Sequence, residues 1–256
     1  VCIAAYFLKI KFVIYENNLI IGKANKYLLP FAKKIFVSYK DLEGISNKYK
    51  DKLITVGNIV REEILKTNIP LNEKDESNSL KILVLGGSQA AKIFAEILPP
   101  IFEQIKKSKI SIKIYQQCQK NQSNELAGFY QKVNIDYEIF NFKDNIIDYY
   151  LKTNLVITRS GASVLGELLN VKIPFISIPL PSSADNHQYK NAEFYLKKGY
   201  GYLLEEKDIK NKLYDLIISI FEDKSSIKNV LSNQRQYSDK NIFRNLKDQI
   251  EKIIDE

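Results

Sequence analysis

The sequence has 256 residues, of which 45% are hydrophobic, enough for one large domain or two ordinary ones with a buried core. No stretch reaches the ~18 consecutive apolar residues that a membrane-spanning helix needs, because Lys9 and Lys11 interrupt the most apolar segment. The two cysteines, Cys2 and Cys118, are far apart and indicate neither a disulfide framework nor a zinc site.

The net charge is +8, from 38 basic and 30 acidic residues. Nearly all of the positive charge is lysine spread along the chain, whereas readers of nucleic-acid sequence concentrate arginine on one element. We therefore do not expect a nucleic-acid partner, but a weak attraction to an anionic membrane surface fits this charge.

The start of the chain is unusual. The first residue is Val1, no methionine occurs, and residues 1–8 resemble the interior of an apolar helix. We expect the sequence to be a piece of a longer protein that lacks its N-terminal portion.

Apolar periodicity predicts alternating helices and short strands along the first third of the chain. The predicted helices are 1–9 and 24–34, and the predicted strands are 12–15, 35–38 and 53–56. Residues 67–79 are polar and contain a proline, so they are the best candidate for a surface loop or linker.

A second unit begins with a strand at 81–85, a turn at 86–89 and a helix from Ala90. Further strands are predicted at 112–116, 136–140, 155–158 and 174–178, a helix from about Asn186, and an amphipathic helix at 240–254. Strands that alternate with helices in this way form βαβ units, so we expect an α/β protein with parallel sheets.

Three strand-to-helix junctions carry residues suited to binding a ligand, and such junctions lie where parallel sheets bind ligands. The first is Gly86-Gly87-Ser88-Gln89-Ala90, where glycines allow a close approach and the next helix start attracts an anion. It lacks the lysine of a Walker loop and the third glycine of a dinucleotide fingerprint. A plain tight turn remains the alternative interpretation.

The second junction is Thr158-Arg159-Ser160-Gly161-Ala162-Ser163, with Glu167 one turn inside the helix that follows. A carboxylate there can accept hydrogen bonds from the 2′ and 3′ hydroxyls of a ribose, as in dinucleotide folds. The alternative is a solvated surface glutamate. We expect this loop and the loop at Gly86 to be neighbours that present unpaired N–H groups to one pyrophosphate.

The third junction runs from Pro179 to Ala192 and contains Asp185, His187 and Gln188. His187 is the only histidine, and a surface or capping role is its ordinary interpretation, as an N-cap is for Asp185. The sequence has no Asp-x-Asp pair, no cluster of metal ligands and no nucleophile elbow. We therefore expect no metal and no cofactor.

Taken in order, these motifs resemble the bacterial UDP-N-acetylglucosamine–N-acetylmuramyl-(pentapeptide) pyrophosphoryl-undecaprenol N-acetylglucosamine transferases of peptidoglycan synthesis, the MurG family. The resemblance rests on residues 86–91, 158–163 with Glu167, and 178–192. Upstream, Tyr15-Glu16-Asn17-Asn18 and residues 57–61 match two further family motifs. The match covers the whole chain.

This resemblance implies a GT-B architecture of two Rossmann-like domains. It implies an incomplete N-terminal, acceptor-side domain at 1–60, a UDP-sugar donor domain at 61–237, and a C-terminal helix at 238–256 that packs back on the first domain. The residues that it implies for binding UDP-N-acetylglucosamine are Asn18, Arg61, Ser88, Lys143, Ala162, Ser163, Glu167 and Gln188. Asn18 and Gln188 would contact the sugar, Arg61 and Ser88 the phosphate side, Lys143 the uracil through its main chain, and Ala162 to Glu167 the diphosphate and ribose.

The implied reaction inverts configuration. The 4-hydroxyl of N-acetylmuramic acid on an undecaprenyl-linked acceptor attacks the anomeric carbon, UDP leaves, and a β-1,4 bond forms. The implied location is the cytoplasmic face of the bacterial inner membrane, as a peripheral protein of cell-wall biogenesis. The family's proposed catalytic base has no counterpart here, so we expect it upstream of Val1 and expect this chain alone to be inactive.

Several residues depart from the family's motifs. Ala90 replaces a glycine, Tyr15 and Asn17 replace a histidine and a glutamine, and Ile59 replaces a proline. Two alternatives therefore stay open: another GT-B enzyme with the same donor, or a fragment that binds the UDP-sugar without turnover. Tyr6, Phe7, Lys9 and Lys11 form either a membrane-contacting patch or a buried helix face with two solvated lysines.

Overall fold

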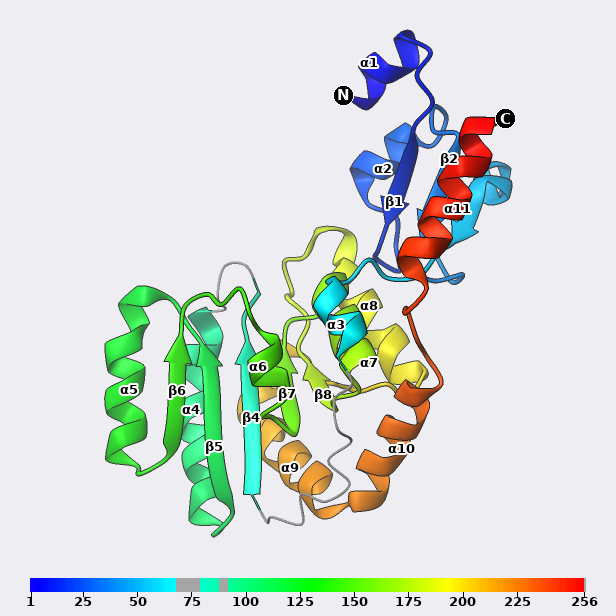
Figure 1. The fold of residues 1–256 in the computed structure, drawn as a ribbon. Coiled ribbons are helices and arrows are strands. Elements are labelled where there is room, and N and C mark those ends of the chain that lie inside the picture. The colour runs from blue at the N-terminus through cyan, green and yellow to red at the C-terminus, as the bar shows by residue number, and fades with distance from the viewer. Residues whose placement is uncertain (68–78, 88–91, 256) are drawn as a thin grey trace.

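The computed structural model describes residues 1–67, 79–87 and 92–255, which form two units joined by two passages of the chain (Figure 1). The smaller unit has a parallel sheet in the order β1-β2-β3, formed by β1 (Val13–Glu16), β2 (Lys34–Val37) and β3 (Leu53–Thr55). A helix, α2 (Lys23–Leu28), connects the first two strands. Ile14, Ile35 and Val37 of the sheet pack with Leu29 in a small core.

The larger unit contains a six-stranded parallel sheet in the order β6-β5-β4-β7-β8-β9. Its strands are β4 (Ser79–Leu85), β5 (Ser111–Gln117), β6 (Asp136–Phe140), β7 (Leu155–Thr158), β8 (Phe175–Ser177) and β9 (Tyr202–Leu203). Counted from β4, the order is 3-2-1-4-5-6, the arrangement of dinucleotide-binding sheets. The topological switch point, where such sheets bind ligands, lies between β4 and β7. The predicted α/β architecture is confirmed, and strands β6 and β7 have the predicted bounds.

Helices cover both faces of this sheet. One face is packed by α4 (Lys92–Lys107), α5 (Ser123–Lys132) and α9 (Ile209–Glu222), with Phe94, Leu98 and Leu213 fully buried. The other face carries α3 (Glu62–Lys66), α6 (Ile147–Tyr150), α7 (Ala162–Val171) and α8 (His187–Lys197). The predicted helix from Ala90 begins, within the described residues, at Lys92. The predicted loop at 67–79 lies mostly outside them.

The chain returns to the smaller unit near its end. After α10 (Lys224–Arg235) it crosses over and forms α11 (Ile242–Asp255), which lies along β2 in Figure 1. Ile242 and Ile253 of α11 pack with Phe36 and Val56. Domain boundaries at residues 60 and 237 stay a prediction.

The first helix, α1 (Cys2–Phe7), differs from the expectation of an apolar helix interior. It has no buried residue, and Phe7 is 77% exposed. It projects at the end of the smaller unit that is distant from the six-stranded sheet (Figure 1). Among the described residues, none of the helices combines the length and apolar character needed to cross a membrane.

The two passages between the units meet at one buried carboxylate, Asp239. It accepts hydrogen bonds from the main-chain N–H and the side-chain amide of Asn58, from the hydroxyl of Tyr237 and from the amide of Asn170, at 2.7–3.1 Å. Gly57 has a φ of 107°, and a Cβ there would lie 2.4 Å from Oδ1 of Asp239. The junction is therefore closely packed and polar.

We predict that Asp239→Ala lowers the free energy of unfolding by about 3 kcal/mol, because it leaves several buried donors without an acceptor. Urea unfolding followed by circular dichroism measures the change. Asp248→Ala, which removes an exposed carboxylate of α11, is the matched control and should stay within about 0.5 kcal/mol of the parent protein. Equal stability of the two variants would contradict the role of Asp239.

Lys172 should make the free energy of unfolding depend on pH. Burial lowers the pKa of its ammonium from 10.5 to about 8, and the group donates to the carbonyls of Leu169 and Tyr237. Between these two pKa values the unfolded chain binds a proton that the folded chain has released, so this group makes the free energy of unfolding rise with pH. Below about pH 8 both states are protonated and the contribution is flat.

We expect Lys172→Met to abolish this rise. Urea unfolding at pH values of about 7.5 and 9.5 gives the change for the parent and for the variant. Lys210→Met, at an exposed lysine of α9, serves as the control that should keep the rise. A rise of the same size in the Lys172 variant would show that other groups cause it.

Candidate functional site

A cavity of about 180 Å³ opens at the carboxyl ends of the central strands. It is lined by Leu85 at the end of β4, Gly87 after that strand, Gln117 of β5, Phe140 of β6 and Thr158 of β7. These residues surround the switch point of the sheet, which is the position of ligands in doubly wound folds. The predicted adjacency of the turn at Gly86 and the loop at Ser160 is thus supported, since residues next to both line one cavity.

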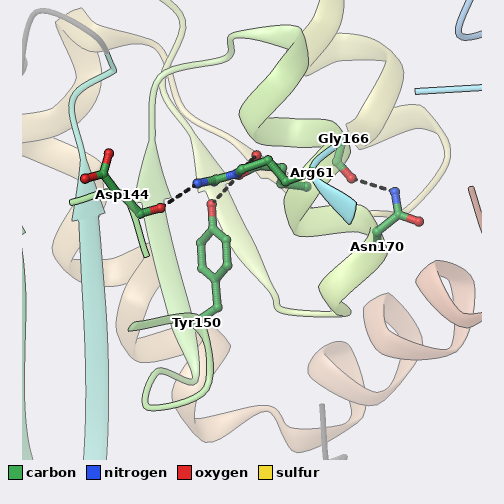
Figure 2. Close-up of polar contacts among 6 residues, drawn as sticks. Arg61, Asp144, Tyr150, Gly166 and Asn170 are labelled. Carbon is green, nitrogen blue, oxygen red and sulfur yellow. Dashed lines mark hydrogen bonds and ion pairs between the residues drawn. The ribbon is translucent and has the colours of Figure 1, made fainter. Parts of the chain in front are cut away.

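Glu167 of α7 lies in this cavity, and its side chain is only 12% exposed, so it is not a solvated surface glutamate. Arg61 binds its carboxylate with two parallel hydrogen bonds, Nε to Oε1 at 2.8 Å and Nη2 to Oε2 at 2.7 Å. The hydroxyl of Tyr150 donates to Oε2 at 3.0 Å. Nη1 of Arg61 donates to the main-chain carbonyl of Asp144 at 3.1 Å, and Figure 2 shows Asp144 and the Tyr150 hydroxyl near the guanidinium end of Arg61.

These contacts alter the titration of the partners. The hydrogen bond to Glu167 raises the pKa of the Arg61 guanidinium, which therefore stays charged. Burial, followed by the charge of Glu167, raises the pKa of the Tyr150 phenol well above its usual value. The cluster is consequently an ion pair with a neutral phenol as an additional donor.

The main-chain N–H groups of the two loops correct one expectation. The N–H of Gly86 donates to Oε1 of Gln117 at 3.1 Å, and the N–H of Ser160 donates to Oε1 of Gln188 at 3.2 Å. These two amides are therefore paired inside the protein. The start of α7 has no side-chain cap, so its first N–H groups are the ones that can face an anion.

Gly87 is the glycine whose conformation matters at this site. Its φ is 84°, and a Cβ built there would meet nothing within 4 Å. The positive φ favours glycine, and the open space beside it leaves room for a ligand to approach the backbone. Ser88, the predicted phosphate-side residue, lies outside the described residues, as do Gln89 to Ala91.

A second group of residues joins the two units beside Ser160. Asn191 of α8 is fully buried; its amide donates to Oδ1 of Asn18 at 3.0 Å and to the carbonyl of Ser160 at 3.1 Å. Its own Oδ1 accepts from the N–H of Leu19 at 3.0 Å. Asn191 thus brings the predicted sugar contact Asn18 to the loop that precedes α7.

Asn18 is positioned from its other side by Glu16. Oε1 of Glu16 accepts from the N–H of Asn18 at 3.1 Å and from its side-chain amide at 2.9 Å, while Oε2 accepts from the N–H of Gly22 and the amide of Asn25. Glu16 is buried. Both Glu16 and Asn191 occur in the quoted motifs, but sequence reasoning assigned neither a role.

The remaining predicted residues fall into the same region. Ala162 and Ser163 start α7, and Oγ of Ser163 accepts from the amide of Asn17 at 3.4 Å. Oε1 of Gln188 also accepts from the N–H of Leu180 at 2.9 Å, so its NH2 is the group that can donate to a ligand. Lys143 lines the cavity.

Arg159 and His187 are turned to other partners. The guanidinium of Arg159 pairs with Glu206 and donates to the carbonyls of Ile178 and Pro179, so it supports the fold. Nδ1 of His187 lies 2.7 Å from the carbonyl of Ala184, and Asn186, not Asp185, is the N-cap of α8. Among the described residues, no group of three or more histidine, cysteine or carboxylate side chains could hold a metal ion.

Comparison with known proteins identifies the family of the chain. The model of the glycosyltransferase family 28 C-terminal domain matches residues 81–250. The UDP-N-acetylglucosamine–N-acetylmuramyl-(pentapeptide) pyrophosphoryl-undecaprenol N-acetylglucosamine transferase of Pelagibacter ubique is 34% identical over 259 residues, covering 100% of this chain and 71% of that protein. The chain therefore belongs to the same glycosyltransferase family as the Pelagibacter ubique transferase.

A second relative supports the membership, and a solved structure supports the fold. The transferase of the same name from Rickettsia felis is 37% identical over 250 residues, covering 91% of this chain and 68% of that protein. The crystal structure of Acinetobacter baumannii MurG has a TM-score of 0.78 at 24% identity, covering 98% of this chain and 70% of that chain. The predicted GT-B fold is therefore confirmed.

Proposed function

We propose that this chain is the donor-binding part of a hexosyltransferase that transfers N-acetylglucosamine from UDP-N-acetylglucosamine to an undecaprenyl-pyrophosphoryl N-acetylmuramyl-pentapeptide. The observation that carries the proposal is Glu167, a shielded carboxylate in the cavity at the switch point of a dinucleotide-type sheet. The names of the relatives from Pelagibacter ubique and Rickettsia felis specify the same donor and acceptor.

In this proposal the UDP-sugar donor extends from the cavity around Glu167 to the residues around Asn191. Glu167 accepts from the ribose hydroxyls, and the uracil lies against the main chain at Lys143. The diphosphate faces the start of α7 at Ala162 and Ser163, with Arg61 and Ser88 on its phosphate side. Asn18 and the NH2 of Gln188 contact the sugar. Asn191 donates to Asn18 and to the carbonyl of Ser160, and the N–H of Ser160 donates to Gln188. These hydrogen bonds bring Asn18 and Gln188 together, which supports placing the sugar between them.

The reaction is a single displacement in which the 4-hydroxyl of the acceptor sugar attacks the anomeric carbon and UDP departs with inversion. Negative charge grows on the departing diphosphate. The N–H groups at the start of α7 are preorganised to stabilise that charge, and one such donor is typically worth about 3 kcal/mol. Among the described residues we assign no catalytic base; His187 is half-buried, and its Nδ1 already lies 2.7 Å from the carbonyl of Ala184.

Replacement of Glu167 tests the ribose assignment. We predict that the parent protein binds UDP more tightly than TDP, which lacks the 2′-hydroxyl. Glu167→Ala should reduce this preference, because UDP loses the contacts of two hydroxyls and TDP loses only that of its 3′-hydroxyl. A hydrogen bond to a charged acceptor suggests a loss of about tenfold. Calorimetric titration with UDP, TDP and UDP-N-acetylglucosamine measures it.

Glu125→Ala, at an exposed carboxylate of α5, is the control and should keep the preference. Equal UDP affinity in the parent and in the Glu167 variant would remove the ribose assignment. Circular dichroism of both variants checks that the fold is intact.

The smaller unit is proposed to contact the cytoplasmic face of the inner membrane. Five apolar or aromatic side chains near the start are exposed and adjacent to Lys9: Ile3, Tyr6, Phe7, Leu8 and Ile10. Aromatic and basic side chains together suit the interface of an anionic bilayer. Lys11 is partly engaged, because its ammonium donates to the carbonyl of Ile253 at 3.1 Å.

We therefore predict that Lys9→Glu, and separately Phe7→Ser, weakens binding to phosphatidylglycerol vesicles. A lysine near an anionic surface contributes about 1 kcal/mol, and charge reversal also adds a repelled negative charge, so Lys9→Glu should reduce binding by roughly thirtyfold. Vesicle sedimentation measures it. Lys120→Glu, which makes the same charge change in the larger unit, is the control, and equal losses in the two charge variants would contradict a specific patch.

A further inference from the structure

The proposed function uses Glu167 but leaves its partner Tyr150 without a role. Tyr150 is among the largest fully buried side chains, and its ring belongs to the core between the sheet and α7. Its hydroxyl nevertheless reaches Oε2 of Glu167 at 3.0 Å (Figure 2). The Tyr150 phenol, which core packing fixes in place, thus donates to one oxygen of the Glu167 carboxylate.

The second partner, Arg61, is held differently. It precedes α3, a five-residue helix, and its side chain is 41% exposed against 12% for that of Glu167. Arg61 can therefore leave the carboxylate by turning toward solvent or toward a ligand. Tyr150 cannot leave without opening the core.

The number of acceptor positions on Glu167 makes this difference important. An ionised carboxylate has about four lone-pair positions. Arg61 takes one on each oxygen, and Tyr150 takes a second one on Oε2. About one position remains, whereas a ribose that donates through both the 2′ and 3′ hydroxyls needs two.

We infer that Tyr150 is the positioning residue that holds Glu167 for a ribose diol, and that Arg61 occupies the carboxylate only until the diol displaces it. This inference rests on the proposed function, because it takes Glu167 as the ribose acceptor. Its new content is that the two partners of Glu167 differ in role. The buried Tyr150 hydroxyl stays bonded to the carboxylate when the ligand binds, and the exposed Arg61 guanidinium is displaced from it. The departing guanidinium keeps its charge and becomes available to the diphosphate.

The phenol suits the permanent position chemically. Burial keeps the Tyr150 hydroxyl protonated, since it raises the pKa of that group. It therefore remains a hydrogen-bond donor, with no charge of its own to compete with the ligand. The hydroxyl orients the carboxylate without neutralising it.

Tyr150→Phe tests the positioning role, with UDP and 2′,3′-dideoxy-UDP as ligands in calorimetry. Loss of a hydrogen bond to a charged group should raise the Kd of UDP about tenfold. The Kd of dideoxy-UDP should stay unchanged, because that ligand has no diol for Glu167. A purely structural role would weaken both ligands equally, and an unchanged Kd for UDP would equally overturn the inference.

Tyr149→Phe is the matched control, because the adjacent Tyr149 donates to Glu138 instead of Glu167. It should leave the ratio of the two Kd values as in the parent. In a Glu167→Gln background, Tyr150→Phe should cause no further change in that ratio. An additional change there would show that Tyr150 acts independently of the carboxylate.

Arg61→Ala tests the displacement with uridine, which has the diol but no phosphate. Removal of the competing guanidinium should tighten uridine binding about fivefold, since an ion pair of this exposure contributes about 1 kcal/mol. UDP should gain less than uridine or lose affinity, because its diphosphate loses a cationic partner. Uridine binding that is unchanged or weaker would overturn the displacement.

Lys66→Ala, at the end of the same helix and paired with Glu62, controls for a change of net charge. Failure of the proposed function looks different from failure of this inference. In the first case the folded parent protein binds neither UDP nor uridine. In the second, UDP binds to the parent and depends on Glu167, but the diol-specific effects of Tyr150 and Arg61 are missing.

Discussion

The Asp239 carboxylate is the interaction on which the arrangement of the two units depends. It collects donors from Asn58 on the first passage between the units, from Tyr237 on the second, and from Asn170 at the end of α7. A buried carboxylate with this many donors is strongly position-specific, because moving any one element leaves a buried polar group unpaired. The two passages are thereby tied to each other and to the helix that carries Glu167.

The same junction determines which side chains meet in the cavity. Asn58 packs against Gly166, where an added Cβ would come within 3.0 Å of the Asn58 side chain. Three residues further along, Arg61 then reaches Glu167, the neighbour of Gly166. A glycine at 166 lets the first passage between the units, at Asn58, approach α7 closely enough for this pairing. The geometry of the candidate site therefore depends on a contact outside the cavity.

Much of the fold could be predicted from sequence periodicity, because short apolar strands bounded by glycine or polar residues leave a clear pattern. Strands β6 and β7 and the position of Glu167 one turn into α7 are examples. Periodicity could not predict which donors meet which acceptors over long separations. The loops at Gly86 and Ser160 are predicted to present unpaired amides, but the N–H groups of these two residues donate to Gln117 and Gln188. Helix α1 was expected to resemble a helix interior because its residues are apolar, yet composition does not say what lies beside a helix.

Tyr150 illustrates why such partners escape sequence reasoning. A tyrosine in an apolar run is ordinarily a core residue, and Tyr150 is one; only its hydroxyl belongs to the site.

The exchange proposed for Arg61 has an electrostatic basis. An isolated carboxylate would be costly to keep in a cavity with so little exposure, and a bidentate arginine offsets that cost while no ligand is bound. When a diphosphate enters, the arginine can pair with it, while the ribose hydroxyls and Tyr150 donate to the carboxylate that the arginine has left. Binding a doubly charged ligand at a site that already contains a carboxylate becomes feasible because the cation stays within reach of both.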